Sequence, residues 1–158
     1  MEKTPRSFYT VRFNDCDPLG HLNNARYIDY FINAREDHLK ESYGIDLKEW
    51  ALRGLSFVVN QHEIKYIRPV TYNDRVCIQS ALIAAGDTWL LVEMCMFDEQ
   101  AQALKAILWT KFTHINMRTG KRETIPADLT DFIQQALWDG ADSKKGMKER
   151  ISFLLGRT

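Results

Sequence analysis

The stretch "RFNDCDPLGHLNNARYIDYF" (residues 12–31) joins a strand-like segment to a helix-like one. Its middle gathers aspartate, histidine, asparagine, glycine and proline within a few positions. A connection that only turns the chain rarely carries so many groups capable of acid–base chemistry. The stretch is therefore a catalytic site, a metal site or a well-capped helix start, and the surrounding elements must decide among the three.

The residues after this loop predict one long helix. Apolar side chains recur at helical spacing from Asn24 to Tyr43. Asn23 or Asn24 is a suitable N-cap, and Gly44 stands where a helix ends in a left-handed turn. Such a helix is about 30 Å long, because each residue adds about 1.5 Å. Its wide apolar face requires a broad surface to cover it.

The remaining chain predicts a sheet that can provide this cover. Turn residues at 73–74, 86–87 and 119–120 are those that tight reversals use. Connections this short favour antiparallel pairing between strands that are neighbours along the chain. We expect strands at 7–13, 55–69, 75–85, 88–98 and 101–117, and a short amphipathic helix after Pro126.

This order of elements predicts an α+β fold, in which a curved antiparallel β-sheet wraps around a long central α-helix. We interpret residues 1–158 as a single domain, with a core at about 7–117 and a C-terminal helix and tail at about 126–158. The sheet edges would stay open in a monomer, so we expect a homodimer or a homotetramer. The tail after residue 139 suggests no function.

Composition restricts the function classes. Lys plus Arg and Asp plus Glu both number 21, so the zero formal net charge gives no reason to expect a nucleic-acid partner. No apolar run approaches the roughly 20 residues that cross a bilayer, and the start "MEKTPRSFYT" lacks the apolar core of a secretory signal. The three cysteines lack CxxC spacing, which indicates reduced thiols. We expect a cytoplasmic protein without membrane insertion.

The opening stretch also carries a family resemblance. "DCDPLGHLNNARY" (residues 15–27) stands between a first strand and a long helix, with a block of strands after the helix. In this position it resembles the hotdog-fold acyl-CoA thioesterases of the 4-hydroxybenzoyl-CoA thioesterase-like family. The family pattern is approximately Asp-x-Asp-x-x-Gly-His-x-Asn-Asn-x-x-Tyr. The "HLNN" part is also similar to the corresponding part of plant acyl-ACP thioesterases, which share the fold.

The resemblance implies an enzyme that hydrolyses an acyl-CoA thioester to the free acid and the CoA thiol, with no cofactor and no metal. Asp17 matches the family's catalytic carboxylate, either as general base for water or as direct nucleophile. Free backbone N–H groups at the helix start, near Asn24, would stabilise the oxyanion. His21 would orient Asp17 or the water, or hydrogen-bond the thioester carbonyl.

The resemblance assigns substrate contacts to four further residues. Gly20 would let the loop backbone approach the substrate or take a positive φ, and Asn23 would cap the helix and hold the loop. Tyr27 would border the acyl pocket. Glu63 would join the site across a dimer interface, as residues of this strand do in relatives, although a solvated strand face is the ordinary interpretation. Adjacent strand residues face opposite sides of a sheet, so only one of His62 and Glu63 can point into a given pocket.

Other interpretations remain open at this stage. A hydratase or dehydratase acting on acyl thioesters and a noncatalytic acyl-thioester binding domain are the alternatives. Asp15, Asp17 and His21 could together bind a divalent metal, although Asp15 is better interpreted as a structural residue of the loop. Cys16 lies between two carboxylates, which raise the pKa of its thiol and argue against a cysteine nucleophile.

Overall fold

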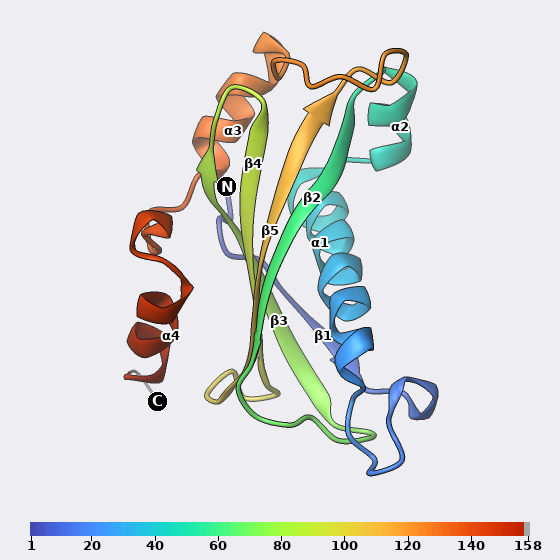
Figure 1. The fold of residues 1–158 in the computed structure, drawn as a ribbon, viewed down its shortest axis with the longest axis vertical. Coiled ribbons are helices and arrows are strands. Elements are labelled where there is room, and N and C mark those ends of the chain that lie inside the picture. Colours follow the sequence, from blue (N-terminus) through green and yellow to red (C-terminus); the bar gives the residue numbers. More distant parts are fainter. Residues whose placement is uncertain (157–158) are drawn as a thin grey trace.

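The fold is built on one five-stranded sheet. The computed structural model describes residues 1–156, and all neighbouring strands in it pair antiparallel in the spatial order β1-β3-β4-β5-β2 (Figure 1). The predicted α+β class, with a curved antiparallel sheet around one long helix, is confirmed. The strands are β1 (Arg6–Thr10), β2 (Ser56–Tyr66), β3 (Arg75–Ala85), β4 (Trp89–Asp98) and β5 (Leu104–Ile115).

The position of β2 corrects one prediction. The strands before and after the turn at 73–74 were expected to be neighbours, but β2 pairs with β5, and β3 pairs with β1 and β4. Only β3–β4 and β4–β5 are joined as hairpins. The connection between Tyr66 and β3 is longer than a tight turn. A turn within it is stabilised by the Asp74 carboxylate, which accepts from the Thr71 N–H at 2.9 Å. Two long strands, β5 and β4, therefore separate β2 from β3.

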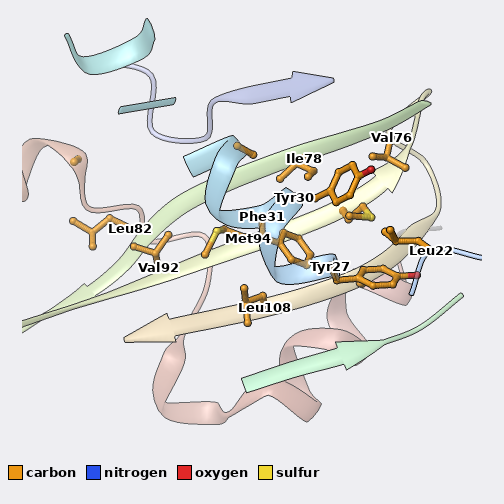
Figure 2. Close-up of a cluster of buried hydrophobic side chains, with 14 of the residues drawn as sticks. Leu22, Tyr27, Tyr30, Phe31, Val76, Ile78, Leu82, Val92, Met94 and Leu108 are labelled. Carbon is orange, nitrogen blue, oxygen red and sulfur yellow. The ribbon is translucent and has the colours of Figure 1, made fainter. Parts of the chain in front are cut away.

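The helix α1 (Tyr27–Tyr43) lies against one face of the sheet (Figure 1). A 3₁₀ turn (Asn24–Arg26) precedes it, and Gly44 ends it in the left-handed conformation at φ 65°, as predicted. Figure 2 shows Tyr27, Tyr30 and Phe31 reaching from α1 toward sheet side chains such as Ile78, Met94 and Leu108. Each such fully buried side chain contributes about 1.5–3 kcal/mol. The helical spacing in the sequence thus corresponds to a real buried stripe.

The C-terminal tail covers the opposite face of the sheet. Its helix α4 (Met147–Leu155) packs beside β5, and Met147 joins a second apolar cluster with Ile107 and Trp109. A buried ion pair between Arg150 and Glu93 holds it there, with the two charged groups 2.7 Å apart. Figure 1 places α1 and α4 on opposite sides of the sheet. The tail, for which the sequence suggested no role, is therefore an integral layer of the fold.

Two short helices close the end of α1 that lies away from the opening stretch. The helix α2 (Leu47–Leu52) begins at Asp46, whose carboxylate accepts from the Lys48 N–H, and α3 (Thr130–Ala136) follows Pro126 as predicted. The helix α2 was not expected, because six residues are too few to show a helical period. None of the helices within residues 1–156 is both long and apolar enough to cross a membrane. The remaining 3₁₀ turns are Phe13–Asp15, Ala127–Leu129 and Ser143–Lys145.

Candidate active site

The loop between β1 and α1 holds the Asp17 carboxylate in a fixed orientation. One carboxylate oxygen, Oδ1, accepts from the backbone N–H of Leu19 at 2.9 Å and from that of His21 at 3.0 Å. The loop can close this tightly because Gly20 takes a φ of 78°, a conformation that residues with a Cβ rarely adopt. Among the described residues, Oδ2 has no hydrogen-bond partner. Asp17 is half-buried, so this second oxygen is accessible to a ligand.

The start of α1 offers a free peptide donor beside this loop. The Asn23 side chain caps the helix by accepting from the Ala25 N–H at 2.9 Å. The Asn24 N–H has no partner among residues 1–156, and its own carbonyl accepts from the Tyr66 hydroxyl at 2.9 Å. Tyr66 belongs to β2, so the sheet fixes the first turn of the helix. The unpaired N–H and the positive end of the helix dipole together favour an oxyanion at this point.

The loop and the helix start border a common hollow of about 230 Å³. Four residues that the sequence singled out lie in its wall: Asp17, His21, Asn24 and Tyr27. The full lining consists of Asp17, His21, Leu22, Asn24, Tyr27, Tyr66, Ile67, Arg68 and Pro69. The contributions from 66–69 could not be tied to Asp17 from local spacing. Pairing of β2 with β5 and the backbone hydrogen bond from the Leu22 N–H to the Val70 carbonyl bring this segment to the loop, and both join residues far apart in the chain.

Tyr27 forms the inner wall of the hollow. Its ring meets the Tyr66 ring edge-on, with centroids 5.0 Å apart, and only 2% of the residue is exposed. Burial raises the pKa of its hydroxyl, so Tyr27 stays neutral and serves as an apolar surface with one polar tip. Residues of this kind suit a wall that contacts an acyl group.

Asp15, the other aspartate of the motif, anchors the loop. Its carboxylate accepts from the Tyr30 hydroxyl at 2.6 Å, and its backbone carbonyl accepts from the Asn23 N–H at 2.9 Å. Burial and this hydrogen bond raise the pKa of Tyr30 to about 12. Asp15 therefore points toward α1 and away from the hollow's lining. The structural interpretation of Asp15 is consistent with these contacts.

Cys16 lies between the two aspartates but is unsuited to nucleophilic attack. Desolvation is the main cause that raises the pKa of its thiol, and the negative charges of Asp15 and Asp17 raise this pKa further. The thiol donates to the Arg12 carbonyl at 3.4 Å. Since the thiolate is the reactive form, these surroundings keep Cys16 unreactive.

Glu63 is not brought together with Asp17 within one chain. It stands opposite Trp109 in the β2–β5 register and borders a different hollow, with Gln61 and Lys111, on the α4 side of the sheet. Its neighbour His62 faces the α1 side, where Nδ1 lies 2.8 Å from the Thr110 hydroxyl. Any participation of Glu63 depends on a second subunit, and it stays a prediction.

The acidic and histidine side chains do not converge as metal ligands would. Within residues 1–156 no group of three or more His, Cys, Asp or Glu side chains is arranged to hold a metal ion. Asp15 is engaged by Tyr30, so it is unavailable to join Asp17 and His21 in a shared site. The geometry therefore gives the metal interpretation no support.

Comparison with known proteins agrees with this geometry. A carboxylate loop leading into a long helix, inside a curled antiparallel sheet, defines a hotdog-fold protein, and the model of the thioesterase-like superfamily matches residues 11–137. The chain belongs to this superfamily. It is 30% identical over 127 residues to the long-chain acyl-CoA thioesterase FadM of Escherichia coli (strain K12), covering 79% of this chain and 93% of FadM.

Solved structures show the same architecture. The probable thioesterase YbaW of Escherichia coli matches with a TM-score of 0.73 at 25% identity, over 84% of this chain and 98% of that one. The 12:0-ACP thioesterase of Umbellularia californica matches with a TM-score of 0.78 at 19% identity, over 92% of this chain and 55% of that one. At this identity the second likeness shows the fold alone. The prediction of a thioester hydrolase is thus confirmed at the level of the family.

Proposed function

We propose that this protein is an acyl-CoA thioesterase that uses Asp17 as its catalytic carboxylate. The observation that carries the proposal is the Asp17 carboxylate, in which Oδ1 accepts two backbone hydrogen bonds and Oδ2 accepts none within residues 1–156. Asp17 lines the same hollow as Asn24, whose backbone N–H has no partner among the described residues. Membership in the thioesterase-like superfamily and the likeness to FadM support the reaction class. FadM is named for long-chain acyl-CoA, so this is the first substrate class to test.

Thioester hydrolysis needs a base or nucleophile at the carbonyl carbon and a donor at the developing oxyanion. In this proposal the free oxygen of Asp17 supplies the first and the Asn24 N–H supplies the second. One donor aimed at an oxyanion is worth about a hundredfold to a thousandfold in rate. The Tyr66 hydroxyl supports this donor by fixing the Asn24 peptide. His21 acts through its peptide N–H, which orients Asp17.

Two roles for Asp17 fit these contacts. As general base it takes a proton from water, which then attacks the thioester; as nucleophile it forms a mixed anhydride that water cleaves. A single turnover in water labelled with heavy oxygen can identify the nucleophilic role, because only that role can place the label in Asp17. General-base attack labels the released acid in the first turnover. Nucleophilic attack, followed by attack of water on the Asp17 carbonyl of the anhydride, labels Asp17 and releases an unlabelled acid; this pattern identifies the nucleophilic role.

The proposal also includes a contact to the CoA carrier and a second subunit at the site. Arg68 borders the hollow with an exposed side chain, and a guanidinium is well suited to the phosphates of CoA. A partner subunit docked along β2 would narrow the hollow and bring further strand residues to it. The proposed assembly is a homodimer or homotetramer with its sites at the dimer interface.

The test is release of free thiol from a panel of acyl-CoAs by the parent protein, by Asp17→Asn and by His21→Gln. Asp17→Asn should lower hydrolysis at least about a hundredfold, because the amide is neither base nor effective nucleophile. His21→Gln keeps the peptide N–H that orients Asp17, so it should retain most of the activity.

Three outcomes would contradict the proposal or part of it. Hydrolysis unchanged by Asp17→Asn would remove Asp17 from the chemistry. Hydration of an enoyl-CoA without thiol release would favour a hydratase, and binding without either reaction would favour a noncatalytic domain. A loss in His21→Gln equal to that in Asp17→Asn would assign a direct role to the imidazole.

A further inference from the structure

A second and larger cavity lies further along α1, separate from the Asp17 hollow. Its volume is about 300 Å³, and none of its lining residues belongs to the hollow around Asp17. It is bordered by α1, α2, α3 and the sheet, and its wall is mainly apolar, with Ile32, Trp50 and Phe132 as examples. The cavity suits a hydrocarbon chain.

One side chain in this wall does not fit a purely hydrocarbon ligand. Arg35, on α1, is only 8% exposed and borders the cavity. Its Nη1 donates to the Ser80 hydroxyl at 3.0 Å, and its guanidinium carbon lies 5.7 Å from the Tyr43 ring centroid. Neither group is negatively charged, because burial raises the pKa of Tyr43.

Within residues 1–156, no carboxylate forms an ion pair with Arg35. The ion pairs among the described residues join other arginines to acids, and Arg35 is in none of them. Glu36 also borders the cavity but is exposed and makes no ion pair with Arg35. Desolvation lowers the pKa of Arg35, which expresses the cost of holding this charge without a counter-ion.

The neighbouring His38 shares its hydrogen-bond partner with Arg35, so few acceptors are present for the buried nitrogen atoms. Its Nδ1 lies 2.7 Å from the same Ser80 hydroxyl, and its Nε2 is buried without a hydrogen-bond partner. Ser80 thus serves two nitrogen-bearing side chains at once. A buried cation, short of acceptors and facing an apolar cavity, is complementary to an anion with a hydrocarbon body.

We propose that this cavity binds a free fatty acid, with the carboxylate on Arg35 and the hydrocarbon chain along the apolar wall formed by α2 and α3. A carboxylate would supply the missing counter-ion and accept two parallel hydrogen bonds from the guanidinium fork. The site is distinct from the Asp17 hollow, and the proposal does not depend on hydrolysis.

The test is calorimetric titration of the full chain with laurate below its critical micelle concentration and with lauryl alcohol below its solubility limit. The two ligands share a hydrocarbon chain and differ in charge. The parent protein should bind laurate at least about tenfold more tightly than the alcohol, and Arg35→Met should abolish this preference. Arg75→Met, which removes an exposed arginine from the start of β3, should leave the preference unchanged.

Two further readouts locate the ligand and separate this proposal from the proposed function. Laurate should change the fluorescence of Trp50 in the cavity wall, and Trp50→Phe should lose this signal while keeping the calorimetric binding. Asp17→Asn should bind laurate as the parent does, whether or not the chain is a thioesterase. Equal affinity of the parent for laurate and lauryl alcohol would overturn the proposal, and this comparison needs no variant. Laurate binding unchanged in Arg35→Met would overturn it as well.

Discussion

The Asp17 carboxylate is oriented by peptide groups of its own loop. The N–H groups of Leu19 and His21 hold one oxygen, and the positive φ of Gly20 allows both to point inward. Backbone donors need no particular side chain, so a substitution at Leu19 or His21 leaves them in place. Gly20 is different, because a residue with a Cβ is strained in this conformation by roughly 1–2 kcal/mol.

His38 makes stability depend on pH. Burial, assisted by the charge of Arg35, lowers the pKa of His38 from 6.5 to about 4 in the folded chain. Between these two values the unfolded chain binds a proton that the folded chain does not. The contribution to stability is therefore complete above the unfolded pKa and is lost as the pH falls toward the folded pKa.

We expect His38→Gln to remove this part of the pH dependence. Glutamine can still hydrogen-bond Ser80 but does not titrate, so its free energy of unfolding should fall less than that of the parent as the pH drops from 6.5 to about 4. Urea unfolding of both proteins at one fixed protein concentration measures the difference. Parallel pH profiles for the two would show that His38 is not the group responsible.

The helix α1 contributes both to the core and to the candidate site. Its buried stripe fixes it across the sheet, and its first turn, tied to β2 by Tyr66, presents an unpaired N–H beside Asp17. Arg35 and His38 interrupt the apolar stripe on the same buried face. A helix that only filled the core would not need a buried charge at this position.

The helix α4 is fastened to the outer face of the sheet by a buried ion pair. Nε and Nη2 of Arg150 both donate to the Glu93 carboxylate, at 2.8 and 2.7 Å, and Trp109 donates to it at 2.9 Å. Both charged side chains are about 5% exposed or less. Each charge offsets part of the desolvation cost of the other through their mutual attraction and hydrogen bonds.

Breaking this pair should be strongly destabilising. Arg150→Met leaves the Glu93 carboxylate buried without its counter-ion, which should cost about 3–5 kcal/mol in the free energy of unfolding. The double variant Glu93→Gln/Arg150→Met should recover much of this loss, since no lone charge remains. Chemical denaturation of the single and double variants gives both values.

An exposed ion pair is the matched control for this measurement. Arg53 and Asp128 form an ion pair in which both side chains are about half exposed. Arg53→Met should therefore change the free energy of unfolding by about 1 kcal/mol or less. A loss for Arg150→Met as small as that for Arg53→Met would show that α4 is not held by its ion pair.

At the scale of the whole molecule, the two edges of the sheet differ. β1 is a five-residue edge, whereas β2 presents an eleven-residue edge with exposed apolar side chains. Val58 and Val59 are 39% and 44% exposed. A long edge that carries exposed apolar side chains pairs readily with another strand. Since β2 also ends at the Asp17 hollow, a second copy docked there would border the site.

We expect the double variant Val58→Lys/Val59→Lys to weaken assembly. Charges on a pairing edge repel their copies across the two-fold axis. Sedimentation should show a shift from dimer or tetramer toward monomer, with a parallel loss of thiol release. Phe8→Lys places one lysine on the β1 edge and should leave assembly intact. A monomeric parent, or equal dissociation in both variants, would contradict an interface along β2.

Sequence patterns were sufficient where the physics is local. The helical period over 27–43, the Asn23 cap and Gly44 gave the helix, because each acts within a few residues. The turn at Gly86 and Asp87 gave the β3–β4 hairpin for the same reason. The prediction failed at β5, which begins at Leu104 and not at 101, because the Asp98 carboxylate accepts from the N–H groups of Gln102 and Ala103 and extends the turn.

By itself, the sequence determined the α+β class, the long helix and the loop that carries Asp17. Only the tertiary structure decided which strands are neighbours, because pairing of β2 with β5 depends on contacts between residues far apart in the chain. That pairing returns Tyr66 and Arg68 to the start of α1 and turns Glu63 to the opposite face. It also leaves β2 at the edge, and burial against the sheet deprives Arg35 of a counter-ion. Periodicity cannot specify such features, since they arise from packing at a distance.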